Sequence, residues 1–251
     1  MPVHLQAWSE AVDQAVIDNL LAVQDEIMFS FGDNVRAYGP KVFGLYGIGV
    51  NITRARLTSP TLRRTSVVEV EPVDISVEPT FPSPWNDWWD HPIPISTGEI
   101  LNAQAAENGA GATRMSFFAW VGDTNPATPE GTITTIRATA AVALVAYTWT
   151  SVALVYDTTL PTGTYQIVGM RVESATALAA RLILSEQQTH RPGCIGYDAA
   201  SDVDDERFRK GNSGVWGIFK EENPPTVQFF AAAADAAETV WLDVIGPTGG
   251  A

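Results

Sequence analysis

The chain has 251 residues, of which 45% are hydrophobic and 18% are charged, and its formal net charge is −14. This composition suffices for a buried core in one large domain or two small ones, and it excludes a disordered chain. The negative charge repels phosphate and argues against a general nucleic-acid-binding protein.

Residues 8–28 carry apolar side chains at helical spacing. Ser9 is suited to cap a helix, and Glu10 favours its first turn. The apolar stripe includes Val12, Val16, Leu20 and Val23. We therefore expect an α-helical arm within 1–34. The arm packs either on its own domain or on a neighbouring subunit, and the stripe is the expected interface.

From residue 35 onward the pattern changes to short β-segments separated by turn residues. The expected strands lie within 41–58, 66–77, 93–103, 113–122, 132–140, 141–157, 163–173, 177–185, 214–220, 226–232 and 239–245. Many short strands with turns between them are typical of an antiparallel β-sandwich or barrel. A proline-containing loop at 123–131 is the expected boundary between two β-domains, 35–125 and 126–251.

Segments 52–61 and 167–176 resemble each other. Ile, Arg, Ser and Thr recur in both at one fixed offset, and each segment reads as strand, short turn, strand. The similarity is a candidate internal duplication, although strand sequences also match by chance.

The residues of common catalytic sites are sparse. The three histidines, His4, His91 and His190, lie far apart in the sequence, and Cys194 is the only cysteine. The sequence has no nucleophile elbow, zinc pattern, phosphate loop or dinucleotide fingerprint. We therefore expect a protein that is not an enzyme and needs no cofactor. The sequence begins without the basic start and apolar core of a signal peptide, so we expect folding in a cytoplasm.

One acidic loop is a weak candidate for binding Ca²⁺, which takes six to eight oxygen ligands. Its carboxylates are Asp202, Asp204 and Glu206. Their spacing differs from that of the helix-loop-helix calcium loop, and basic residues follow directly. A solvated loop is the alternative.

A second loop concentrates tryptophan at Trp85, Trp88 and Trp89. Exposed tryptophan rings can stack on sugars, which would suit a carbohydrate-binding adhesin or fibre module. Buried rings would instead close the end of a sandwich or anchor a subunit contact, because each carries a large apolar area.

Four arginines form the one basic cluster: Arg54, Arg56, Arg63 and Arg64. They could face a packaged genome or an internal membrane. The alternative is pairing with acids across an interface, because acids are in excess in this chain.

The run from Gly163-Thr-Tyr-Gln-Ile-Val-Gly-Met-Arg-Val-Glu-Ser to Arg181-Leu-Ile-Leu resembles the coat proteins of tailless, lipid-containing phages. The resemblance implies two jelly rolls in tandem and a major capsid protein without catalytic residues. It also implies trimeric capsomers in an icosahedral shell, contacts with other virion proteins, and a virion assembled in the host cytoplasm. A minor or decoration virion protein is the alternative within the same class.

Overall fold

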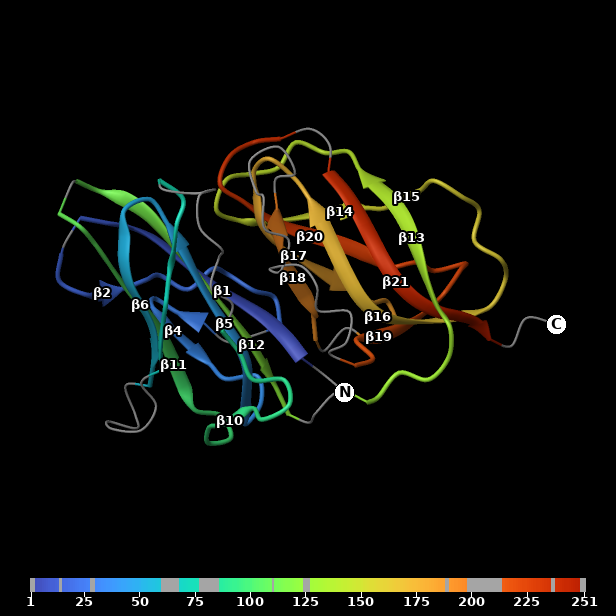
Figure 1. Cartoon of the computed structure of the whole chain (residues 1–251), viewed down its shortest axis with the longest axis horizontal. Helices are drawn as coiled ribbons and strands as arrows, with labels where there is room; N and C mark the ends of the chain where they lie inside the picture. The colour runs from blue at the N-terminus through green and yellow to red at the C-terminus, as the bar shows by residue number, and fades with distance from the viewer. Residues whose placement is uncertain are drawn as a thin grey trace. The chain divides into compact units, whose positions relative to one another are not determined.

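The computed structural model describes residues 3–13, 15–27, 30–59, 68–76, 86–109, 111–123, 127–187, 190–197, 214–235 and 238–248. Within these residues the protein is all-β and contains no helix, so none is long and apolar enough to cross a membrane (Figure 1). The chain divides into an N-terminal unit, Leu5–Asp123, and a C-terminal unit, Met1–His4 with Thr124–Ala251.

The N-terminal unit contains two sheets. In the first sheet, the order is β1 (Val3–Val12), β12 (Thr113–Gly122), β5 (Lys41–Gly49), and then the short strands β8 (Val73–Asp74), β9 (Asn86–Asp87) and β10 (Ile93–Pro94), which all pair with β5. In the second sheet, the order is β3 (Ser30–Phe31), β4 (Asn34–Arg36), β11 (Ile100–Glu107), β6 (Ile52–Thr58) and β7 (Val68–Val70), and β2 (Asp18–Asn19) also pairs with β11.

The two sheets of this unit enclose an apolar core, which makes the unit a β-sandwich. The first sheet contributes Trp8, Leu45 and Phe117, and the second contributes Val35, Leu57 and Leu101. Strand β5 is buried along almost its whole length, so both of its faces are apolar. This double burial explains why 41–58 does not alternate cleanly in sequence, because a strand buried on both faces has no polar side.

The C-terminal unit is a second β-sandwich. One sheet has the order β15 (Val155–Tyr156), β13 (Ile133–Ala140), β21 (Glu238–Thr248), β16 (Thr164–Glu173) and β19 (Gly217–Lys220). The other has the order β14 (Trp149–Ala153), β20 (Thr226–Ala231), β17 (Ala177–Ile183) and β18 (Gly193–Tyr197). The end of β18 also pairs in parallel with β16 over two residues.

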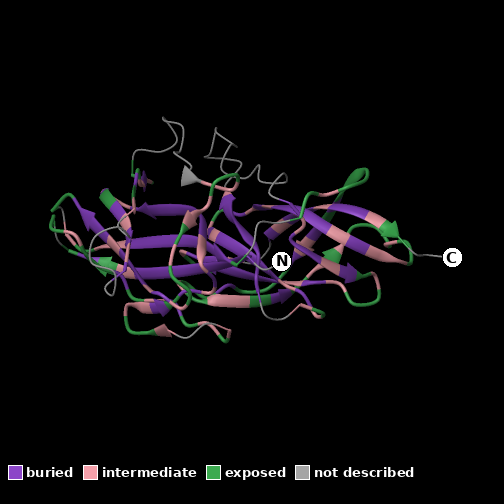
Figure 2. Cartoon of the chain, turned by 90° about the horizontal axis from the view of Figure 1, so that it is seen from below, coloured by how far each residue is buried: buried purple, intermediate pink, exposed green. Residues whose placement is uncertain are grey.

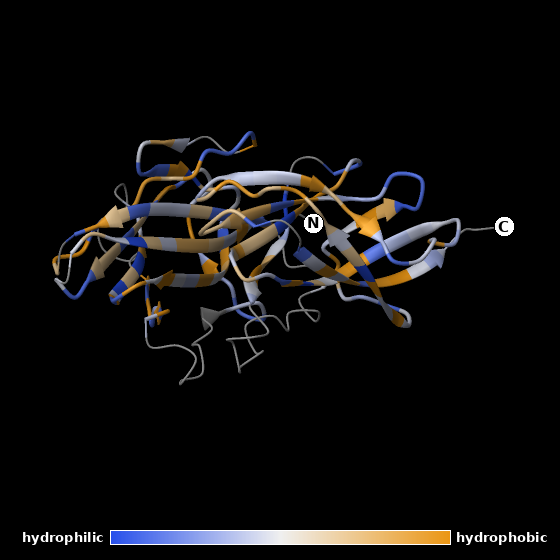
Figure 3. Cartoon of the chain, turned by 90° about the horizontal axis from the view of Figure 1, so that it is seen from above, coloured by the Kyte–Doolittle hydropathy of each residue, from blue (hydrophilic) through white to orange (hydrophobic). Residues whose placement is uncertain are grey.

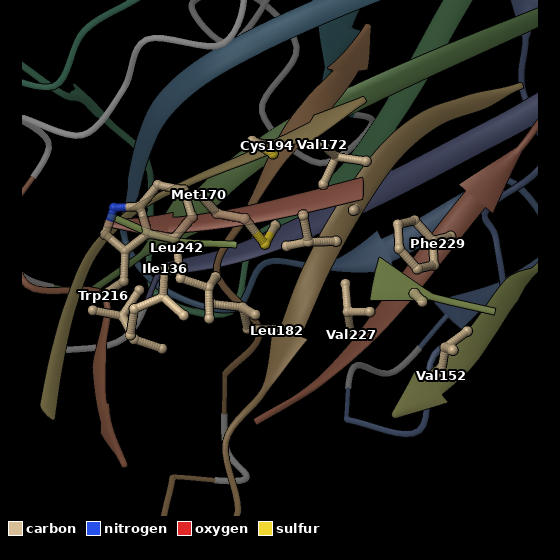
Figure 4. Packing of buried hydrophobic residues seen from close by; sticks show 14 of the residues in the cluster. Ile136, Val152, Met170, Val172, Leu182, Cys194, Trp216, Val227, Phe229 and Leu242 are labelled. Atoms are coloured by element: carbon tan, nitrogen blue, oxygen red, sulfur yellow. The ribbon is translucent and has the colours of Figure 1, made fainter. Parts of the chain in front are cut away.

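The core of the C-terminal unit lies between these sheets. One sheet contributes Ile136, Met170 and Leu242, and the other contributes Leu182, Val227 and Phe229 (Figure 4). Buried residues follow the strands, and exposed residues gather in the connections (Figure 2). Hydrophobic residues run along the strands of both units (Figure 3). Removal of this apolar surface from water is the main stabilising contribution to each unit.

The two units share one strand order. We count the main strands along the chain as β1, β4, β5, β6, β7, β10, β11 and β12 in the N-terminal unit, and as β13, β14, β16, β17, β18, β19, β20 and β21 in the C-terminal unit. In each unit the first sheet then reads first, eighth, third, sixth, and the second sheet reads second, seventh, fourth, fifth.

The expected α-helical arm is wrong. Residues 3–12 form strand β1, and the chain then returns beside it, with Ser9 N donating to Leu21 O at 2.8 Å and Val23 N donating to Ala7 O at 2.9 Å. The stripe does not form one face, since Val12, Leu20 and Val23 are buried in their own chain while Val16 is 70% exposed. Val12, Val16 and Leu20 are four residues apart, and this spacing suits a strand as well as a helix.

Candidate functional site

An open, polar pocket of about 520 Å³ lies on the outer face of the second sheet of the N-terminal unit. The strand period of two places its residues there: Leu101, Ala103 and Ala105 of β11 face the core, so Asn102 and Gln104 face outward. The lining residues are mostly amides and hydroxyls: Asn19, Asp33, Asn34, Arg56, Thr58, Ser59, Asn102 and Gln104.

Three of these residues form a hydrogen-bonded row across neighbouring strands. Gln104 of β11 stands opposite Arg56 of β6 and opposite Asn19 of β2. Arg56 Nε donates to Gln104 Oε1 at 2.7 Å, and Gln104 Nε2 donates to Asn19 Oδ1 at 2.6 Å. We call Asn19, Gln104 and Arg56 the N-terminal polar row. Each amide in it is oriented by its neighbours.

Asp33 is the acceptor that holds several of the lining side chains in place. Its carboxylate accepts from Asn19 Nδ2 and from Asn34 Nδ2, each at 2.6 Å. Its backbone carbonyl accepts from Trp8 Nε1 and from Asn102 Nδ2, each at 3.1 Å. Because four donors hold this one residue, the pocket wall is organised before any ligand arrives.

The C-terminal unit repeats the row at the corresponding place. Gln228 of β20 stands opposite Arg181 of β17 and opposite Ser151 of β14. Arg181 Nε donates to Gln228 Oε1 at 2.8 Å, and Gln228 Nε2 donates to Ser151 Oγ at 3.0 Å. We call Ser151, Gln228 and Arg181 the C-terminal polar row. Strands β17 and β20 hold the fourth and seventh places in their unit, as β6 and β11 do in theirs.

This correspondence corrects the sequence comparison of 52–61 with 167–176. That comparison matched Arg56 with Arg171, which lies on β16, the third strand of its unit. The equivalent of Arg56 is Arg181, and each stands in an Ala-Arg-Leu tripeptide, residues 55–57 and 180–182. The comparison was therefore wrong by one strand.

The arginine–glutamine pair of the C-terminal polar row is buried, although Ser151 at the end of the row is exposed; the N-terminal polar row instead lines an open pocket. Arg181 is fully buried, the Trp149 ring lies 4.0 Å from its guanidinium carbon, and His4 Nε2 is 3.3 Å from its Nη1. Arg191 Nη1 donates to the same Gln228 Oε1 at 2.8 Å. Such a network stabilises the fold when its members are satisfied, and it is costly to break.

Two further titratable groups are buried in the C-terminal unit. Glu238 is 1% exposed, and burial raises its pKa to about 7, with Asp235 adding to the rise and a hydrogen bond from Ser174 opposing it. Burial also raises the pKa of the Cys194 thiol to about 12, against the opposing charge of Arg171. Cys194 is therefore a weak nucleophile at neutral pH.

Two of the three histidines, His4 and His190, lie closer in space than in sequence. Arg191 N donates to His4 Nδ1 at 3.2 Å, which brings His4 beside the chain neighbour of His190. His190 Nε2 lies 3.2 Å from Trp216 O. Both histidines are buried within the C-terminal unit.

The calcium candidates Asp202, Asp204 and Glu206 lie outside the described residues. Within the described part of the chain, no group of three or more His, Cys, Asp or Glu residues is placed to hold a metal ion.

The tryptophan loop is described in part. Trp85 lies outside the described residues, whereas Trp88 and Trp89 are half-buried. The Trp89 ring packs on Phe43 with ring centroids 5.1 Å apart, and Trp88 packs against the core of the N-terminal unit. These contacts cover part of the surface of each ring.

The basic cluster is likewise described in part, because Arg63 and Arg64 lie outside the described residues. Arg54 pairs with Glu69 of the same chain, with Nε and Oε1 2.6 Å apart, so it has an acidic partner, whereas pairing across an interface stays a prediction. Glu69 in turn has a pKa below its usual value because of the hydrogen bond from Arg54. Arg56 instead donates to an amide in the pocket.

An apolar loop joins β13 to β14 in the C-terminal unit. Residues 141–147 contain no polar or charged side chain except the Tyr147 hydroxyl, and Leu144 alone among them is buried. Val145 is 57% exposed and Val142 is 36% exposed. Exposed apolar residues that are contiguous in this way are unusual on the surface of a monomer when the patch is large.

No protein-family model matches this chain, and a search of curated proteins also finds no match.

Proposed function

We propose that this chain is a structural virion protein, the major capsid protein of an icosahedral shell, with each unit a jelly roll. The observation that carries the proposal is the strand order common to both units: first, eighth, third, sixth in one sheet and second, seventh, fourth, fifth in the other. Eight strands in two facing sheets form the jelly roll, which is common in viral capsid domains and is also found in lectins and cupins.

The exposed loop 141–147 supports assembly through protein contacts. A shell subunit meets several neighbours, and permanent interfaces are large and more apolar than ordinary surface. Val142 and Val145 supply such surface from the C-terminal unit. In the proposal, copies of the chain cover this loop within trimeric capsomers, and other virion proteins complete the particle.

The net charge of −14 suits a subunit that must stay soluble before it assembles. Added salt screens the repulsion between like-charged subunits. Assembly should therefore be favoured at high ionic strength.

Two rival functions make different predictions. An adhesin or fibre module would bind sugar through the Trp85–Trp89 loop, but the packing of Trp89 on Phe43 favours a structural role for that ring. A minor or decoration protein would bind a shell made by another protein and would not form particles alone. Arg54 is less suited to contact a packaged genome or an internal membrane, because its side chain is already paired with Glu69.

The test is particle formation by the purified chain, followed by sedimentation and electron microscopy over a range of salt. We expect closed particles at high salt from the unaltered protein and small, soluble species from Val145→Asp. The control is Thr159→Asp, which adds the same charge at an exposed polar residue of the C-terminal unit outside this loop. An unaltered protein that stays monomeric at high concentration and high salt would refute the proposal.

A further inference from the structure

We propose that the pocket of the N-terminal unit binds a neutral saccharide. This inference goes beyond the capsid role and does not depend on it, since the described residues that line the pocket all belong to one unit.

The size and lining of the pocket favour a small ligand rich in hydroxyls. Its volume of about 520 Å³ lies within the range of small-molecule sites, roughly 300–1,000 Å³. Its walls are polar, in contrast to the mostly apolar walls of typical small-molecule sites. Amides and hydroxyls both donate and accept hydrogen bonds, as sugar hydroxyls do. An apolar ligand would displace water from these groups without making hydrogen bonds to the donors and acceptors that their mutual contacts leave over.

The charges in the pocket favour a neutral ligand. Among the described residues that line it, Arg56 and Asp33 are the two charged ones, and their charges are opposite. Each carboxylate oxygen of Asp33 already accepts one amide hydrogen, which leaves fewer of its lone pairs for a cation, and Arg56 would repel a cation as well. An anion would meet Arg56 but also the Asp33 carboxylate, whereas a neutral polyol meets no repulsion.

Arg56 can contact such a ligand directly. Its Nε is engaged by Gln104, and its terminal nitrogens have no hydrogen bond to any described residue. The guanidinium donors lie in one plane at fixed angles, a geometry suited to two adjacent oxygen atoms. Neighbouring ring hydroxyls of a sugar provide two such oxygens.

Phe31 supplies an apolar surface beside these polar groups. It stands opposite Asn34 in the β3–β4 hairpin, so both side chains leave the same face of the sheet, and directly opposite residues have Cβ atoms about 5 Å apart. Gly32 provides the positive φ of 60° required at the hairpin turn. Phe31 is 76% exposed, so folding removes little of its apolar surface from water. A bound sugar would cover it with the C–H face of its ring.

The C-terminal polar row offers an internal precedent for a ring at this position. There the Trp149 ring lies 4.0 Å from the Arg181 guanidinium carbon. In the N-terminal unit the equivalent Arg56 lines the open pocket instead. A flat ligand ring could occupy the space that a side chain of the protein fills in the other unit.

The experiment is saturation-transfer NMR on the full chain with glucose, galactose, mannose and N-acetylglucosamine, followed by titration with the sugar that gives the strongest signal. We expect Gln104→Leu and Phe31→Ala each to weaken binding roughly three- to tenfold, the loss expected for one contact of this kind. The matched controls are Arg54→Gln, on the same face of β6 but outside the pocket, and Val16→Ala, another exposed apolar residue. They should bind as the unaltered protein does.

The inference is overturned if none of the four sugars binds, or if Gln104→Leu and Phe31→Ala bind as tightly as the controls. Sedimentation of the same samples separates this inference from the capsid proposal. Particles without sugar binding would refute the pocket alone, and sugar binding by a permanent monomer would refute the shell alone.

Discussion

The two units place the same arginine–glutamine pair at the same position of the same sheet, in opposite surroundings. In the N-terminal unit, Arg56 and Gln104 line an open pocket. In the C-terminal unit, Arg181 is fully buried and Gln228 is 2% exposed. In both, arginine Nε donates to the glutamine Oε1, at 2.7 Å and 2.8 Å. The pair therefore belongs to the shared architecture, and its surroundings decide what it contributes.

Burial changes the energetic role of the pair. Water can replace either partner at the pocket, so loss of one side chain there leaves the other hydrated. In the C-terminal unit a lost arginine leaves buried polar groups without their partner, and their desolvation is then not compensated. One interaction should thus serve ligand binding in one unit and stability in the other.

The largest expected effect follows directly. Arg181→Ala should lower the free energy of unfolding by about 3 kcal/mol or more, because it leaves buried partners unsatisfied and removes the contact with Trp149. Arg56→Ala should cost less than about 1 kcal/mol, as expected at a solvated site. Urea unfolding of both variants measures the difference.

The reaction rate of the single thiol measures how readily the C-terminal unit opens. Cys194 is buried in the C-terminal unit, so its reaction with a thiol reagent reports opening of that unit. Arg181→Ala should speed the reaction, and Arg56→Ala should leave it unchanged. Equal effects of the two variants would show that burial does not distinguish the pairs.

A smaller effect concerns the buried carboxyl of the C-terminal unit. Glu238 has a pKa of about 7 in the folded chain against an ordinary value of 4.5, so the folded chain binds this proton more tightly than the unfolded chain. The stability linked to this group is present below pH 4.5 and is lost as the pH rises toward 7.

Glu238→Gln removes this titration, because an amide stays neutral. At pH 8 the variant should be more stable than the unaltered protein by about 1 to 3 kcal/mol, a reduced fraction of the 1.36 kcal/mol per pKa unit that linkage allows. Near pH 4 the two should coincide. Thermal unfolding across this pH range measures the difference, and a constant gap at every pH would exclude Glu238 as its source.

The sequence predicts the all-β class because short apolar segments with period two and turn residues between them have few other solutions. The prediction from sequence fails at residues 8–28, because apolar residues four positions apart lie on one face of a helix and also on one face of a strand. The sequence comparison also misplaces the internal repeat. Strands of similar composition resemble one another, so the fourth strand of the N-terminal unit was matched with the third strand of the C-terminal unit. The tripeptide Ala-Arg-Leu, at 55–57 and 180–182, was the signal that would have given the correct match.

The pocket could not be read from the sequence. Its residues come from four strands, the β3–β4 turn and the position after β6, between Asn19 and Gln104, and no short motif joins them. Its amides look like ordinary polar residues of a solvated strand face. Only the register of β2, β11 and β6 shows that Asn19, Gln104 and Arg56 form one row.

The smallest expected effect concerns an ion pair at the surface of the C-terminal unit. Arg137 and Asp157 form a salt bridge with side chains 48% and 39% exposed. Water and salt screen such pairs, which typically contribute about 0 to 1 kcal/mol. Asp157→Asn also removes one negative charge from a chain of net charge −14, which offsets part of the loss.

Asp157→Asn should therefore change the free energy of unfolding by less than about 0.5 kcal/mol, and the change should shrink further in high salt. The counterpart in the N-terminal unit is Glu69→Gln, which breaks the pair with Arg54 and should have no measurable effect either. Urea unfolding at low and high salt tests both variants. If Asp157→Asn cost as much as Arg181→Ala, burial would not be the property that separates strong from weak polar contacts in this protein, and the contrast between the two polar rows would lose its explanation.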